Sequence, residues 1–178
     1  KTERYGNPGF IAILNQISNL WKTNKESVLT SSEQVVKILQ TVSETTTSET
    51  LTQDTLKHAY EQLLGNYDHI YGGFGTSPKF PTPHNYTFLL RWWKRSNVPT
   101  ALEIVEKTLD RMGRGGIYDQ LGGGFHRYST DEYWLVPHFE KMLYDQALLA
   151  IAYTEAYQAT GKALFADIVK GIFTYVLR

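Results

Sequence analysis

Apolar positions recur every three or four residues along much of this chain, which is the spacing of one helix face. The first stripe follows Pro8, a residue that suits the first position of a helix; its members are Phe10, Leu14, Ile17 and Trp21. A second, weaker stripe follows Ser31 and Ser32, which are candidate caps; its members are Val35, Leu39 and Val42. The pattern predicts two amphipathic helices before the polar stretch that starts at Ser43.

The polar stretch SETTTSET, residues 43–50, interrupts the helical pattern. It is short, of low complexity and rich in β-branched threonine, which is typical of an exposed connection. We therefore predict a linker over residues 44–50 and place a domain boundary there.

Helical spacing resumes after the linker in four further stripes. They are Leu56, Tyr60, Leu63 and Tyr67; Phe88, Leu89, Trp92 and Trp93 within about residues 84–97; Leu102, Val105, Leu109 and Met112 after Pro99; and Phe165, Ile168, Ile172 and Val176. Another helix is predicted to begin at Phe139, with Glu140 in its first turn, and to end at Gly161. Its apolar run at residues 147–153 predicts a helix that is buried on most sides.

Two glycine-rich segments separate these helices, YDHIYGGFGTSPKFPTP at 67–83 and GGIYDQLGGGFHRYSTDEYWLVP at 115–137. Alternating aromatic residues predict one short ribbon near Phe125–Tyr128, a pattern that Pro137 ends. No larger sheet is needed, so the predicted class is all-α. Helices with a single apolar stripe flank one that is apolar all round. This arrangement favours two concentric helical layers with the loops gathered at one end, and an ordinary helical bundle is the alternative.

Composition narrows the classes of partner. Lysine plus arginine equals aspartate plus glutamate at 18 each, so no overall field attracts nucleic acid or an anionic membrane. The chain has no cysteine, which excludes disulfides and thiol redox chemistry within it and fits a reducing compartment. We predict a cytoplasmic location, no membrane segment and no cofactor. The opening residues KTERYGNPGF read as the interior of a longer protein.

Three long strings carry a resemblance to a known family: GGFGTSPKFP at 72–81, GGIYDQLGGGFHRYSTDEYW at 115–134 and PHFEKMLYDQALL at 137–149. They resemble the thioredoxin-domain-containing, spermatogenesis-associated-protein-like family of large cytosolic proteins, whose activity is unsettled. In that family a thioredoxin-like domain precedes a six-hairpin α/α toroid, similar to that of N-acylglucosamine 2-epimerases and six-hairpin glycosidases. Gln146 stands where the family often has asparagine.

The resemblance implies an organisation for the chain. Residues 1–43 would be the tail of the thioredoxin-like domain and an entry helix, and residues 51–178 would be the first hairpins of a partial α/α toroid. A toroid lacking its later hairpins leaves apolar faces uncovered, which we expect around Trp92, Trp93 and Tyr153. We therefore expect self-association if the chain is truncated.

Ionisable residues are concentrated around the second glycine-rich segment: Asp119, His126, Asp131, His138, Glu140 and Asp145. Histidine can supply the acid and base that sugar epimerisation needs, and several carboxylates could serve glycoside hydrolysis. We predict His138 and Glu140 as the reactive pair, approached by Asp119 and His126. The helix dipole and Glu140 should act on His138 in opposite directions. Lys141 and Asp145 are expected to form a rim ion pair, and the structural alternative is that the acids only cap loops and helices.

Aromatic residues near the same segment could stack on sugar rings. The set is Tyr71, Phe74, Phe80, Trp92, Trp93, Tyr128 and Trp134. We predict Trp134, Tyr128, Phe74 and Asp145 as substrate-binding, although such aromatic residues more often anchor a core. No metal site is predicted, because His138 and Glu140 are two apart and do not share a helix face. The glycines lack the strand–turn–helix context of a phosphate loop.

Two hypotheses from different classes follow. The first is a carbohydrate-active toroid segment that acts on a small-molecule sugar as an epimerase, isomerase or glycosidase. The second is a non-catalytic interaction module coupled to a thioredoxin-like domain. Convergence of His138, Glu140 and Asp119 on one open cavity would favour the first hypothesis, and a separate capping bond for each would favour the second.

Overall fold

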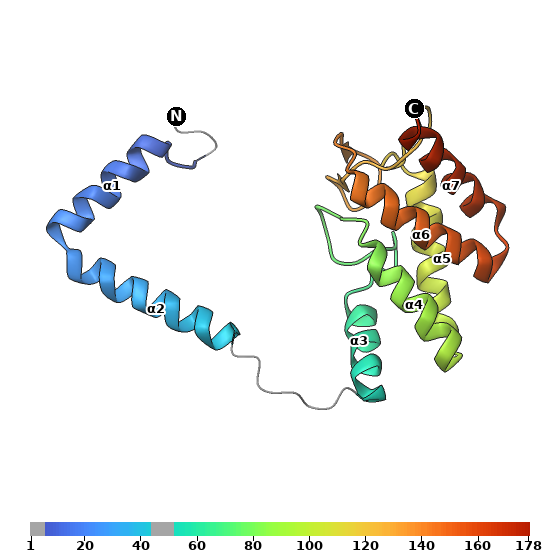
Figure 1. Cartoon of the computed structure of the whole chain (residues 1–178), viewed down its shortest axis with the longest axis horizontal. Coiled ribbons are helices and arrows are strands. Elements are labelled where there is room, and N and C mark those ends of the chain that lie inside the picture. The colour runs from blue at the N-terminus through green and yellow to red at the C-terminus, as the bar shows by residue number, and fades with distance from the viewer. Residues whose placement is uncertain (1–5, 44–51) are drawn as a thin grey trace. The chain divides into compact units, whose positions relative to one another are not determined.

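The computed structural model describes residues 6–43 and 52–178, and the linker predicted at 44–50 lies outside the described residues (Figure 1). The chain divides into two units, Lys1–Thr50 and Leu51–Arg178. Each unit is described by itself.

The first unit contains two helices, α1 (Phe10–Thr23) and α2 (Lys25–Ser43). The predicted stripe of α1 forms, but Gly9 precedes its first residue, so Pro8 lies outside the helix. The predicted caps of the second helix are wrong: α2 begins at Lys25 and runs through Ser31 and Ser32. Asn24 caps it instead, because its side-chain Oδ1 accepts a bond from the Ser27 N–H. Neither helix contains a buried residue.

The second unit is built from α3 (Gln53–Gly65), α4 (Pro83–Ser96), α5 (Pro99–Arg114), α6 (Leu143–Thr160) and α7 (Ala163–Val176). α4 packs against α6, and α5 packs against α7, while α4 also contacts α3 and α5. The helices therefore form two layers, with α4 and α6 in one and α5 and α7 in the other. The loops that precede α4 and α6 lie at the same end of the unit (Figure 1).

Local sequence signals explain the ends of these helices. α4 and α5 each begin with a proline, Pro83 and Pro99, whose missing N–H is not needed at a first helical position. Asn97 follows α4 and Gly161 follows α6, both in the left-handed conformation that ends a helix. Between the layers lies one apolar core, in which the Tyr153 hydroxyl donates a 2.8 Å hydrogen bond to the Leu109 carbonyl.

Helix α6 departs from its prediction in two ways. It begins at Leu143, so Glu140 lies outside it and Asp145 occupies its first turn. It also buries one face only, through Gln146, Leu149, Ala150, Ala152, Tyr153 and Ala156. Leu148 and Ile151, on another face, are 43% and 48% exposed. An apolar run shows that every face of a helix could be buried, but the helices packed against it decide which faces are buried.

A two-stranded ribbon follows the second glycine-rich segment. Strand β1 (Tyr128–Ser129) pairs antiparallel with β2 (Pro137–His138), so that Tyr128 lies opposite His138. Ser129 also pairs with Lys79, which ties the ribbon to the loop before α4. The ribbon is therefore later than predicted, and Pro137, which was expected to end it, belongs to its second strand.

The described residues are predominantly helical with this one short ribbon, which confirms the all-α class. Within those residues, no helix combines the length and the apolar character needed to cross a membrane.

Candidate functional site

The two loops that precede α4 and α6 share one sequence pattern and one backbone geometry. Each runs from a Tyr-Asp pair to a Gly-Gly-Phe triplet, at 67–74 and at 118–125. In each loop the tyrosine pairs with the phenylalanine across an isolated antiparallel bridge. In each, the aspartate N–H donates to the carbonyl of the second glycine, over 2.9 Å for both Asp68–Gly73 and Asp119–Gly124. The loops are a structural repeat.

A lysine closes each loop against its aspartate; Lys79 is fully buried and Lys141 is partly buried. Lys79 Nζ donates to Asp68 Oδ2 over 2.5 Å and to the Gly72 carbonyl over 3.0 Å. Lys141 Nζ donates to Asp119 Oδ2 over 2.7 Å and to the Gly123 carbonyl over 2.8 Å. The predicted ion pair between Lys141 and Asp145 is therefore replaced by Lys141–Asp119, since Lys141 precedes α6.

Asp119 is fully engaged in holding its loop. Its Oδ1 accepts the N–H groups of Leu121 and Gly122, over 3.0 and 2.8 Å. The Gly122 N–H and the Lys141 ammonium hold the pKa of the Asp119 carboxyl well below its ordinary value. Asp119 thus behaves as a loop clamp, and its bonds are made to its own loop and to Lys141, not to His138.

His138 and Glu140 do lie together. His138 Nδ1 is 3.8 Å from Glu140 Oε2, and the two side chains are 44% and 48% exposed. Arg127 Nη1 donates to the same Glu140 oxygen over 2.8 Å, and the Arg127 N–H donates to the Glu140 carbonyl over 2.7 Å. The Arg127 guanidinium lowers the pKa of the Glu140 carboxyl. The result is an ionised carboxylate held beside an imidazole at the loop end.

His138 lies in β2, five residues before α6 begins, so the helix dipole that was expected to act on it is not adjacent. Its ring stacks on Tyr128, with the centroids 4.9 Å apart, because the two residues face each other across the ribbon. Phe80 lies on the Tyr128 ring at 4.8 Å, since the preceding Lys79 pairs with Ser129. We call Phe80, Tyr128 and His138 the aromatic row.

The remaining predicted catalytic residue, His126, is buried rather than exposed to solvent. Its ring meets Phe139 edge-on at 5.2 Å, and its Nδ1 has no hydrogen-bond partner among the described residues. Burial lowers the pKa of His126, the Lys141 cation lowers it further, and Asp119 opposes both. His126 is therefore a buried residue on which the Asp119 and Lys141 charges act.

The predicted binding residues are divided between core and surface. Trp134 is fully buried, and its Nε1 donates to the Tyr71 carbonyl over 3.1 Å, so no ring face is accessible to a ligand. Phe74 packs on Tyr86 within the core, with the centroids 6.0 Å apart. Asp145 is partly buried, and burial raises its pKa while Arg127 opposes this. Tyr128, in the aromatic row, remains at the surface of the ribbon.

Sequence reasoning missed Arg127 and Lys79 and gave Lys141 the wrong partner, although the Tyr-Asp…Gly-Gly-Phe repeat could have indicated that a lysine bonds the aspartate of each loop. Asp131 also proves to be a loop cap: its carboxylate accepts the N–H groups of Tyr133, Leu135 and Val136. Within the described part of the chain, no three histidine, aspartate or glutamate side chains gather as metal ligands would.

Comparison with known proteins places the chain among longer relatives. Spermatogenesis-associated protein 20 of Homo sapiens is 42% identical over 96% of this chain, and the chain spans 23% of its length. The Mus musculus protein of the same name is also 42% identical, with 22% of its length covered. An uncharacterised protein of Caenorhabditis elegans is 38% identical over 85% of the chain and is covered over 21% of its length. No protein-family model matches the chain.

Two solved structures share the fold. Cellobiose 2-epimerase from Spirochaeta thermophila matches 70% of this chain with a TM-score of 0.59 and 19% identity, over 36% of its own length. A sugar epimerase from a ruminal bacterium matches 67% of the chain with a TM-score of 0.53 and 24% identity. The layered helices are therefore part of an α/α toroid.

Proposed function

We propose that this chain is part of a saccharide-binding α/α toroid in which His138 and Glu140 transfer protons to and from a sugar. The observation that carries the proposal is their adjacency, with Nδ1 and Oε2 3.8 Å apart, at the loop end of the helices. The two solved structures of this fold are named as sugar epimerases, which supports a sugar as the substrate class.

The chemistry follows from what each group can do. An imidazole can take up and return a proton near neutral pH, which epimerisation or isomerisation requires. Arg127 keeps Glu140 ionised, so that the carboxylate can orient His138 and stabilise its cation when it holds the proton. The aromatic row provides an apolar surface beside the pair for a sugar ring.

Glycoside hydrolysis is less well supported by the same residues. It needs two carboxylates about 5–10 Å apart that are free to act as acid and base or nucleophile. Asp119 is committed to two backbone N–H groups and to Lys141, and Asp131 to three backbone N–H groups. Of the predicted acids, only the partly buried Asp145 is left as a carboxylate partner for Glu140. Proton transfer by a histidine is the better match.

The test uses the full-length protein that contains this chain. A sugar library is first screened by thermal shift, and turnover of each hit is then followed by NMR. His138→Gln and Glu140→Gln should each lower turnover about 100-fold or more, the usual contribution of a general acid or base, while changing the melting temperature little. His69→Gln, at an exposed loop position, is the matched control.

Two results would contradict the proposal. One is turnover that persists in both variants, and the other is a loss of fold in both with activity retained in whatever protein remains folded. Either outcome would assign His138 and Glu140 to loop structure.

A second candidate is a non-catalytic interaction module coupled to a thioredoxin-like domain. It is favoured by apolar residues that are exposed around the loop end, among them Leu121, Leu135 and Phe139, the last being 78% exposed. Phe139→Lys would then abolish binding of a partner, whereas His138→Gln would not. The two variants together separate a binding surface from a proton-transfer site.

We propose residues 1–43 as the tail of the thioredoxin-like domain and an entry helix. The support is that α1 carries an apolar stripe with no buried residue, which is a face that a further domain could cover. Hydrogen exchange of the full-length protein should show α1 protected. Trp21→Lys should remove that protection without changing exchange in α4–α6.

A further inference from the structure

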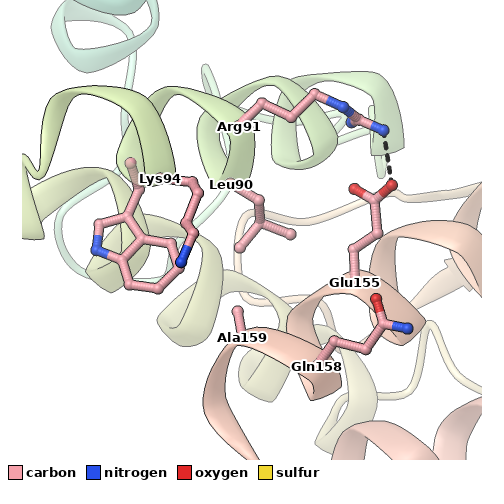
Figure 2. Close-up of a pocket in the computed structure, with 7 residues that line it drawn as sticks. Leu90, Arg91, Lys94, Glu155, Gln158 and Ala159 are labelled. Carbon is pink, nitrogen blue, oxygen red and sulfur yellow. Dashed lines mark hydrogen bonds and ion pairs between the residues drawn. The ribbon is translucent and has the colours of Figure 1, made fainter.

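A groove between α4 and α6 is independent of the loop-end residues. It has a volume of about 430 Å³, within the range of small-molecule sites, and is lined by Leu90, Arg91, Trp93, Lys94, Glu155, Gln158 and Ala159 (Figure 2). Leu90 and Ala159 form its apolar floor. Because Trp93 and Ala159 lie near the C-terminal ends of their helices, the groove is remote along the helices from the glycine-rich loops.

Polar side chains from both helices converge on this groove. Arg91 and Lys94 are three residues apart on α4, and Glu155 and Gln158 are three apart on α6, so each pair shares one helix face. Figure 2 shows the four side chains on the two sides of the floor. Guanidinium, carboxylate, amide and ammonium groups beside an indole form a set that suits hydroxyl groups on a ring.

Arg91 is already fixed in position without a ligand. Its Nη1 donates to the Thr87 carbonyl over 2.9 Å, and its Nη2 donates to Glu155 Oε1 over 2.7 Å. These bonds orient the guanidinium toward the groove, although the Arg91 side chain is 65% exposed.

The charge of the groove is unbalanced. Arg91 is neutralised by Glu155, whereas Lys94 has no ion-pair or hydrogen-bond partner among the residues that the structure describes. One positive charge is therefore available beside the ring-binding groups, and it favours a ligand with one negative group.

We propose that this groove is a second saccharide site, specific for a sugar that carries an anionic group, either a carboxylate or a phosphate. Lys94 pairs with the anion. Gln158 and the fixed Arg91–Glu155 pair bond the hydroxyls, and Trp93 packs on the ring. The site does not depend on proton transfer at His138.

The experiment titrates the protein, labelled with ¹⁵N, with glucuronate, glucose 6-phosphate, glucose and inorganic phosphate, and follows the indole N–H signals. The Trp93 signal, assigned with Trp93→Phe, should shift saturably with both anionic sugars and more weakly with glucose. The signal of Trp134, which is buried at the other end, should not move. Inorganic phosphate alone should produce little change, because it has no ring.

Variants locate the charge. Lys94→Gln should weaken both anionic sugars about two- to fivefold, the magnitude of an exposed ion pair, and leave glucose unchanged. Lys57→Gln, which removes an exposed lysine on α3, is the control, and it should alter nothing. Gln158→Ala should weaken all three sugars.

Several results would overturn the proposal: no saturable shift of Trp93 with either anionic sugar, an equal effect of Lys94→Gln and Lys57→Gln, or a response to phosphate equal to that with glucose 6-phosphate. His138→Gln should leave the titration unchanged. Failure of the loop-end function and failure of this site can therefore be told apart.

Discussion

Replacing Lys79 by methionine should destabilise the second unit more than any exposed lysine substitution. The Lys79 side chain is fully buried, and all three of its ammonium protons are used. They bond Asp68 Oδ2, the Gly72 carbonyl and the Glu132 carbonyl, the last over 3.1 Å. Methionine keeps much of the volume but leaves the Asp68 carboxylate and two carbonyls without that donor.

The magnitude follows from the groups left behind. Removing one partner of a buried ion pair costs about 3–5 kcal/mol, because the other charge stays desolvated. Asp68 retains the N–H groups of Ile70 and Tyr71 and some exposure to water, so we expect the lower part of that range. Burial alone would raise the pKa of Asp68, but the Lys79 and backbone bonds outweigh it, and the net pKa is lowered.

The assay is urea unfolding of this chain followed by circular dichroism, with ΔG obtained by linear extrapolation. Lys57→Met is the matched control; its bridge to Glu61 is exposed, so a loss of less than about 1 kcal/mol is expected. Adding Asp68→Asn to Lys79→Met should recover part of the loss by removing the unpaired charge. A loss below about 1 kcal/mol for Lys79→Met would refute the view that this clamp holds the loop.

Three further outcomes are expected. The pKa of His126 is lowered on folding, so on acidification the unfolded chain takes up this proton at a higher pH than the folded chain does. The stability should therefore fall as the pH drops below about 7. His126→Gln should flatten this part of a profile of melting temperature against pH, and an unchanged slope would contradict the lowered pKa of His126. Gly123 and Gly161 both have positive φ, but only at Gly123 would an added Cβ meet the α7 backbone. Gly161→Ala should therefore lower the unfolding free energy by the ~1 kcal/mol of backbone strain alone, and Gly123→Ala should lower it by well over that amount. Equal losses for the two variants would contradict this expectation. Light scattering should show concentration-dependent self-association that Ile151→Lys and Phe173→Lys reduce, and a monomer at high concentration would count against it.

The helices that the sequence pattern located best are those with residues at their ends that favour a helix start or a helix stop. The range predicted as 84–97 differs from α4 by one residue at each end, because Pro83 and Asn97 mark the boundaries locally. Helix α6 was misplaced because Phe139 and Glu140 suit a helix start, while backbone pairing keeps that segment extended: Arg127 donates to the Glu140 carbonyl. That bond joins residues far apart in the chain, so periodicity could not reveal it.

Uncovered faces were located less well than helices. The apolar surface was expected around Trp92, Trp93 and Tyr153, yet Tyr153 is fully buried and the two tryptophans are partly buried. The exposed apolar residues on α6 and α7 instead include Leu148, Ile151 and Phe173. All of these residues are equally apolar in the sequence, so only packing decides which of them lack a neighbour.

The structure brings one pair of the predicted site residues together and separates the others. His138 and Glu140 are neighbours because they are two residues apart, at the end of β2 and just after it. Asp119 is instead bonded to Lys141, and His126 is buried where both charges act on its pKa. Residue type alone cannot distinguish an aspartate that caps a loop from one that faces a substrate.

That distinction becomes visible when the acids at the loop end are compared by their partners. Asp68, Asp119 and Asp131 each accept backbone N–H groups of their own loop, which fixes the loop and leaves little freedom for chemistry. Glu140 accepts from a side chain only, that of Arg127, and its carboxylate is close to His138. The aspartates thus hold the loops in place, and Glu140, two residues after the end of β2, is an acid whose position they do not explain. Its partner His138 is accordingly the residue at which a test of activity should begin.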